Sequence, residues 1–204
     1  RVVIIGAGTV AEYAARSAMA LGASVSVFDN SISRLRRIQN DLNFPIATSI
    51  LQPKVLEKAL KRADVAIGAL RAQEGRTPCV ISDDMVQKMK SKSVIVDVSI
   101  DQGGCFETSE VTTHENPTFT KHGVIHYCVP NVASRVAKTA SFSLSNIIAP
   151  TLLKVGDGGG VQGMLLRSPN IRGGVYVYNG ILTNKGIGVW FDLPYKEIRL
   201  LLGL

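Results

Sequence analysis

The chain has 204 residues, enough for one or two domains, and its 46% hydrophobic content is sufficient for a buried core. Its net charge of +7 comes from basic residues that are dispersed and not interleaved with aromatic ones, so we expect no nucleic-acid partner. No apolar run is long enough to span a membrane, and the three cysteines form no CxxC pair. These features predict a globular, cytoplasmic protein without membrane association.

A glycine-rich turn lies close to the start of the chain. Residues 1–5 are an apolar run of strand length, Gly6 and Gly8 follow at once, and apolar residues then recur at helical spacing. Gly6 permits a tight turn, Gly8 lets the backbone approach a pyrophosphate, and Ala11 is small enough for close packing of the helix on the strand. Backbone N–H groups at the helix start would face the phosphates. This order of strand, turn and helix is the context of the dinucleotide-binding fingerprint.

An acidic residue directly follows the second predicted strand, which covers residues 24–28. This residue is Asp29, and Arg34 lies nearby on the first turn of a helix predicted over 31–40. A carboxylate here accepts hydrogen bonds from the adenosine ribose and repels a 2′-phosphate, which favours NAD over NADP. The alternative is a plain glycine turn beside an aspartate that caps a helix. Both strands, the helix and Asp29 together favour the cofactor site.

Strand and helix signals alternate as far as residue 130, as in a parallel sheet with helical crossovers. They predict an α/β Rossmann fold, a doubly wound parallel sheet, over residues 1–135. Residues 136–204 are predicted to be a C-terminal helical segment, in which Pro150 should kink or divide a long amphipathic run. Further strands are expected near 44–50, 63–70, 94–98 and 123–129, and further helices at 53–61, 82–89, 138–155, 161–167 and 196–202, with a glycine turn at 156–160.

A doubly wound sheet binds its ligand beyond the carboxyl ends of its strands. Asp101 lies in a loop of this kind, beside two glycines, where a carboxylate can orient a water or hold an ammonium group. A turn-forming aspartate is the alternative. Asn131 either donates its amide to the nicotinamide carboxamide or caps the next helix, and Asp97 is expected to be structural. The histidines lack metal-ligand spacing and are expected to be surface or packed residues, with no metal site: His114, His122 and His126.

Several segments resemble alanine dehydrogenase. The string Asp-Gln-Gly-Gly-Cys at 101–105 is specific, and the segments at 107–109, 112–119 and 126–131 are also similar. The resemblance extends along essentially the whole chain. The related proton-translocating transhydrogenase has a similar Rossmann half, but its corresponding loop usually carries an Ala-Gly-Gly type sequence. A transhydrogenase part is therefore the second alternative, and a non-catalytic NAD-binding module is the third.

The resemblance implies reversible oxidative deamination of L-alanine to pyruvate and ammonia, with hydride transfer to NAD. It matches Asp101 to the family's active-site aspartate, which also lies in the cofactor site with Gly6 and Gly8. The other positions that match cofactor contacts are Thr9, Val10, Asp29, Arg34, Leu70, Arg71, Val98, Ile100, Val129, Asn131 and Val132.

The family's histidine acid/base, its lysine and the arginine that holds the substrate carboxylate lie before the Rossmann domain. We find no counterpart in this chain, which has no initiator Met. We therefore expect a fragment lacking the N-terminal substrate segment, which binds NAD(H) without turning over alanine. The family is commonly homohexameric, so a homo-oligomer is expected. Residues 136–204 should belong to or contact the substrate domain, and without that domain part of their apolar face should be exposed.

Overall fold

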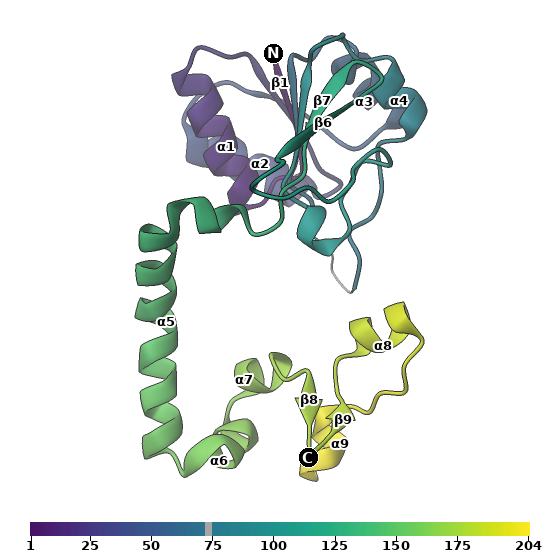
Figure 1. Cartoon of the computed structure of the whole chain (residues 1–204). Helices are drawn as coiled ribbons and strands as arrows, with labels where there is room; N and C mark the ends of the chain where they lie inside the picture. The colour runs from purple at the N-terminus through teal and green to yellow at the C-terminus, as the bar shows by residue number, and fades with distance from the viewer. Residues whose placement is uncertain (72–74) are drawn as a thin grey trace. The chain divides into compact units, whose positions relative to one another are not determined.

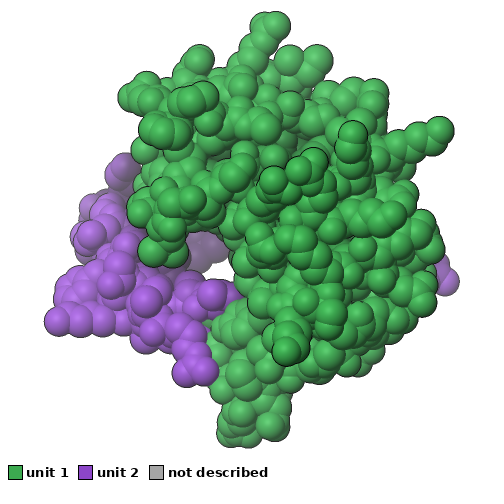
Figure 2. All heavy atoms as spheres, turned by 90° about the horizontal axis from the view of Figure 1, so that it is seen from above, with its two compact units in different colours: residues 1–73, 77–131 green, residues 74–76, 132–204 purple. Residues whose placement is uncertain are grey.

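The computed structural model describes residues 1–71 and 75–204, which form two compact units (Figure 2). The first unit contains residues 1–71 and 77–131 of this described part. The second contains residues 75–76 and 132–204.

A seven-stranded sheet forms the centre of the first unit. Its strands are β1 (Val2–Ile5), β2 (Val25–Phe28), β3 (Ala47–Ser49), β4 (Val65–Gly68), β5 (Val94–Asp97), β6 (Thr118–Lys121) and β7 (Val124–Tyr127). Their order is β3-β2-β1-β4-β5-β7-β6, and every neighbouring pair is parallel except β6 and β7. The chain therefore winds from β1 to one side and then, from β4, to the other. This confirms the predicted doubly wound Rossmann fold, whose ligand crevice lies beside β1.

Helices cover both faces of this sheet (Figure 1). They are α1 (Thr9–Ala20) and α2 (Ile32–Leu42) on one face, and α3 (Pro53–Leu60) and α4 (Asp83–Gln87) on the other. Successive side chains of a strand point to opposite faces, so β1 contributes to both cores. Ile4 packs in the core of α1 and α2, and Ile5 packs in the core of α3. Burial on both faces explains why the parallel strands are continuous apolar runs.

The hairpin at the edge of the sheet differs from the sequence prediction. Strand β6 pairs antiparallel with β7, so the sheet has one strand more than the six predicted. Lys121 pairs with Val124, which leaves only His122 and Gly123 in the turn. Both have positive φ, at 53° and 73°, as a type I′ turn requires. The turn residues were present in the sequence, but the short polar strand before them was missed.

The second unit is mainly helical. Its elements are the 3₁₀ turn η2 (Val132–Val136), α5 (Ala137–Asp157), α6 (Gly160–Arg167), α7 (Pro169–Gly173), the two-stranded sheet of β8 (Val177–Tyr178) and β9 (Ile181–Leu182), α8 (Lys185–Phe191) and α9 (Ile198–Leu202). Helix α5 continues through Pro150, so the proline does not divide it. The proline removes one backbone donor, and the helix extends on both sides of it. The glycine turn before α6 is also shorter than predicted, because α5 extends to Asp157.

Helix α5 has no buried side chain over its 21 residues, all of which lie in the described part of the chain. Its large apolar residues, including Phe142, Ile147 and Leu153, are exposed. Among the helices of residues 1–71 and 75–204, none combines the length and the apolar character needed to cross a membrane.

Candidate functional site

The turn between β1 and α1 has two glycines with different constraints. Gly6 has φ +112°, and a Cβ there would lie 2.4 Å from the carbonyl oxygen of Ala69. Glycine is therefore required for the close approach of this turn to the end of β4. At Gly8 a Cβ would meet nothing within 4 Å, so the space above this residue is open. Gly8 is also the N-cap of α1 and makes no side-chain cap hydrogen bond, which leaves the first-turn N–H groups available to an anion.

Asp29 joins the end of β2 to this glycine turn. It is 5% exposed, and its Oδ2 accepts the backbone N–H of Ala7 at 2.8 Å, while its Oδ1 accepts that of Ser31 at 2.7 Å. The cap of α2 is Ser31, whose hydroxyl accepts the N–H of Arg34. Asp29 is thus not the helix cap that the alternative interpretation required. Its carboxylate lies beside the glycine turn, where the predicted ribose role would place it.

Two arginines of α2 surround this corner. The Arg34 Nη1 lies 4.0 Å from Oδ2 of Asp29, and the Arg34 side chain is 53% exposed. Arg37, which the sequence analysis did not single out, donates from Nη2 to the carbonyl oxygen of Ala7 at 3.1 Å. Its Nη1 also pairs with Glu12 on α1. Arg37 therefore fastens the glycine turn to α2 and α1, and no local sequence pattern marks this contact.

The loops after β4, β5 and β7 are linked at the carboxyl edge of the sheet. Oδ1 of Asp101 accepts the backbone N–H of Asn131 at 2.9 Å, although 30 residues separate them. Asn131 has φ +51°, so its backbone is in the left-handed region. Ser99 donates its hydroxyl to the carbonyl oxygen of Leu70 at 2.9 Å. The structure thus brings Asp101, Asn131 and Leu70 to one edge, and Asp101 and Asn131 are exposed there.

The other predicted contact residues divide between the two units. Most belong to the first unit, in the first turn of α1 or in the segments that follow β4, β5 and β7: Thr9, Val10, Arg71, Val98, Ile100 and Val129. Val132 is the first residue of η2 and belongs to the second unit.

Two histidines have clear structural surroundings. Nδ1 of His126 lies 3.0 Å from the carbonyl oxygen of Val124, so this nitrogen carries the proton and Nε2 accepts the Thr108 hydroxyl at 2.8 Å. The ring is fully buried and stacks on Phe119, and burial lowers the pKa of His126. His122 lies at the surface, where its Nε2 is 2.8 Å from Oδ2 of Asp83. Both positions are those of packed or surface histidines.

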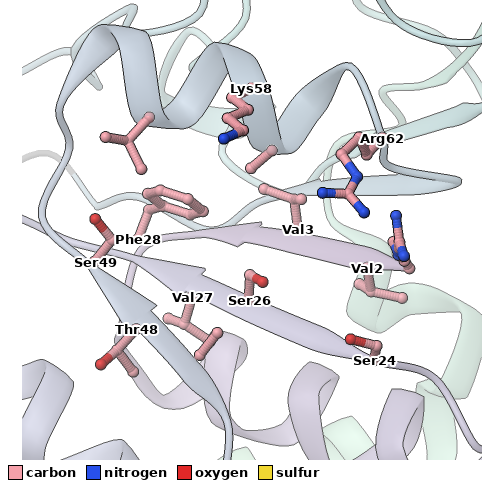
Figure 3. A pocket seen from close by; sticks show the side chains of 14 residues that line it. Val2, Val3, Ser24, Ser26, Val27, Phe28, Thr48, Ser49, Lys58 and Arg62 are labelled. Carbon is pink, nitrogen blue, oxygen red and sulfur yellow. The ribbon is translucent and has the colours of Figure 1, made fainter.

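A hollow with a volume of about 410 Å³ lies on the α3 side of the sheet (Figure 3). Side chains of β1 to β3 line it on one side, and Lys58 and Arg62 lie on the other, on α3 and just beyond its end. None of the 14 lining residues is a predicted contact residue. The hollow is therefore separate from the site at the carboxyl edge.

The observed corner fits a dinucleotide. The open backbone at Gly8 allows the close approach that a pyrophosphate needs, and the uncapped start of α1 suits its negative charge. The nearly buried carboxylate of Asp29 suits a ribose. The fold and the site define a Rossmann-type dinucleotide-binding domain.

Comparison with known proteins identifies the family. Residues 1–185 match the family "Alanine dehydrogenase/PNT, C-terminal domain", and the chain belongs to this family. An alanine dehydrogenase of Halomonas elongata is 41% identical over 203 residues, which cover 100% of this chain and 54% of that protein. The chain thus spans about half the length of the curated relatives it matches. Membership implies NAD as the cofactor.

Solved structures agree with this assignment. An L-alanine dehydrogenase superposes with a TM-score of 0.83 and 34% identity, covering 94% of this chain and 52% of that one. A transhydrogenase from Sinorhizobium meliloti superposes with a TM-score of 0.70 at 20% identity, over 90% of this chain and 49% of that one, and shows a shared fold alone. The likeness to alanine dehydrogenase is therefore the stronger one in both sequence and structure.

Proposed function

We propose that this chain is the NAD-binding part of an NAD-dependent alanine dehydrogenase. The reaction of the complete enzyme would be the reversible oxidative deamination of L-alanine to pyruvate and ammonia. The observation that carries the proposal is the open phosphate turn at Gly8 beside the nearly buried carboxylate of Asp29. The family and the 41% identity to an alanine dehydrogenase supply the reaction class.

The adenosine half of the cofactor would be held at the corner of β1 and β2. Gly8 and the start of α1 bind the pyrophosphate, because no side chain fills this space and the N–H groups there are uncapped. Asp29 accepts the ribose hydroxyls, and its charge disfavours a 2′-phosphate. The backbone N–H groups of Ala7 and Ser31 hold this carboxylate in place, and Arg34 lies 4.0 Å from it.

The nicotinamide half would lie at the loops after β4, β5 and β7, against the positions of Leu70, Val98, Ile100, Val129 and Asn131. NAD supplies the hydride acceptor for the substrate carbon when it is bound. Asp101 is the catalytic candidate, because it is exposed at this edge and the Asn131 N–H fixes one of its oxygens at 2.9 Å. A carboxylate held in this way can hold an ammonium group or orient a water.

The complete enzyme would need further parts. We propose that residues 136–204 belong to or contact a substrate domain, that the protein is cytoplasmic, and that it assembles as a homo-oligomer. The exposed apolar residues of α5 support the first of these points, since an apolar helix face requires a partner. Light scattering of the purified chain would measure its oligomeric state.

Titration calorimetry with NADH tests the cofactor assignment, and an assay of alanine-dependent NADH production tests the assignment of the reaction. We expect the chain alone to bind NADH and to leave alanine unoxidised, because the family's substrate-holding residues have no counterpart in it. A folded sample that does not bind NADH would refute the cofactor site. Alanine oxidation by the chain alone would refute the view that essential residues lie elsewhere.

A further inference from the structure

Asp97 is a buried carboxylate at the end of β5 with three strong hydrogen-bond donors around it. It is 1% exposed. Its Oδ1 accepts the backbone N–H of Ser99 at 3.0 Å, and its Oδ2 accepts the backbone N–H of Cys105 at 2.9 Å and the Ser109 hydroxyl at 2.7 Å. Within the described residues no cation pairs with it. These neutral donors therefore compensate the cost of burying the charge.

The surroundings of this carboxylate are built around its two oxygens. A Cβ on Gly68 would lie 2.7 Å from Oδ1, and a Cβ on Gly104 would lie 2.7 Å from Oδ2. Gly104 also has φ +74°, which favours glycine on conformational grounds. Burial and the nearby Asp97 raise the pKa of the Cys105 thiol, so this thiol keeps its proton and lies 3.9 Å from Oδ1. Two glycines thus leave room for this carboxylate, and a protonated thiol contacts it.

The three donors come from both ends of a single loop. Ser99 is two residues after Asp97, whereas Cys105 and Ser109 are eight and twelve residues after it. The carboxylate therefore draws the returning end of the loop back to the end of β5. Asp101 lies between these fixed ends and contacts Asn131 through its own carboxylate. The backbone N–H of Gly104 also donates to the Ser99 carbonyl at 3.0 Å, so without Asp97 the segment that carries Asp101 would lose part of its closure rather than all of it.

We propose that Asp97 is a positioning residue for the nicotinamide half of the site, which acts by closing the loop that carries Asp101. This inference rests on the proposed NAD site and deepens it. The adenosine half is held by Gly8 and Asp29, which are not hydrogen-bonded to this loop. Loss of Asp97 should therefore affect the two halves of the cofactor differently.

The test compares two ligands on the full chain. NADH reaches the nicotinamide side, whereas ADP-ribose lacks the nicotinamide and reports on the adenosine half. In the Asp97→Asn variant an amide NH2 group replaces one of the two acceptor oxygens and therefore faces another hydrogen-bond donor. We expect the NADH Kd to rise about tenfold as a result. The ADP-ribose Kd should stay within about twofold. The fluorescence enhancement of bound NADH should also decrease, because that signal comes from the nicotinamide.

Two further variants separate positioning from simple unfolding. Ser109→Ala removes only the 2.7 Å hydroxyl donor, and we expect a smaller change in the same direction even if Asp97→Asn does not fold. Asp84→Asn changes a surface carboxylate whose side chain is 66% exposed and should leave both ligands unaffected. Equal weakening of NADH and ADP-ribose in a folded variant, or an unchanged ratio in both variants, would overturn the proposal.

Hydrogen exchange of the chain without ligand tests the loop independently of the cofactor. Peptides covering 98–109 should exchange faster in Asp97→Asn or Ser109→Ala, while peptides of β1 keep the wild-type rate. Unchanged exchange in the loop would refute the role of Asp97. If the wild-type chain bound neither ligand, the proposed NAD site would fail, and this exchange result would still decide whether Asp97 closes the loop.

Discussion

Alanine substitutions at the two glycines of the glycine turn should separate an effect on folding from an effect on binding. Gly6→Ala places a methyl group 2.4 Å from the Ala69 carbonyl oxygen and forces alanine into φ +112°. Gly8→Ala places the same methyl group in open space, at a φ of −84° that any residue adopts. The same chemical change therefore tests backbone packing at one position and ligand space at the other, two residues away.

The expected magnitudes follow from these contacts. Backbone strain of the Gly6 kind costs about 1–3 kcal/mol, and the overlap with a backbone oxygen adds to it. If the strain lowers the free energy of unfolding by about 2 kcal/mol, and each kcal/mol lowers the Tm by about 2–4 °C, Gly6→Ala should lower the Tm by at least about 4–8 °C. Gly8→Ala should change the free energy of unfolding by about 1 kcal/mol or less. It should raise the NADH Kd at least about tenfold, since the methyl group lies where the pyrophosphate approaches.

Thermal unfolding followed by circular dichroism measures the first effect, and calorimetric titration with NADH measures the second. Each variant serves as the control for the other. A Gly8→Ala chain that binds NADH with the wild-type Kd would show that the open space at Gly8 is not the phosphate site. A Gly6→Ala chain with the wild-type Tm would contradict the close approach of this turn to β4.

Three other predictions concern the carboxylate at β2 and the buried histidine. Asp29→Ala should raise the NADH Kd about 10-fold or more, because the loss of one charged hydrogen bond has this effect, whereas the surface control Asp84→Ala should leave the Kd unchanged in the same titration. NADPH should bind the wild-type chain at least about tenfold more weakly than NADH, and equal affinities would remove the repulsive role of Asp29. Because burial lowers the pKa of His126, the unfolded chain binds a proton below about pH 6.5 that the folded chain does not. The free energy of unfolding should therefore decrease as the pH falls from 7 to 5, by at most about 1.4 kcal/mol per pH unit. Urea titrations should show that His126→Gln removes this dependence and that His122→Gln keeps it.

The parts of the fold that the sequence predicted are those set by local patterns. The strand, the glycine turn and the helix at the start of the chain are adjacent in sequence, so residues 1–22 contain their own signal. The hairpin of β6 and β7 was half predicted, because Thr118–Lys121 is short and partly polar and becomes a strand only by pairing with β7. Helix α5 was predicted to be kinked or divided at Pro150; the division was wrong, because the helix continues as one element through the proline.

The site shows the same division between local and distant information. Asp29 and Gly8 belong to a fingerprint with a fixed order, so their places were predictable. The contact of Asp101 with Asn131 joins residues 30 positions apart, and the contact of Arg37 with Ala7 has the same separation. Only the packed sheet brings such pairs together. Asp97 was expected to be structural. That three groups of one loop donate hydrogen bonds to it could not be predicted from its position in an apolar strand.

A crystal structure of the chain with NADH is the most direct test of the central claim. We predict the pyrophosphate against the N–H groups at the start of α1, the adenosine ribose on Asp29, and the nicotinamide beside Asp101 and Asn131. NADH bound elsewhere, for instance in the hollow beside Lys58 and Arg62, would contradict the assignment of the carboxyl edge as the cofactor site.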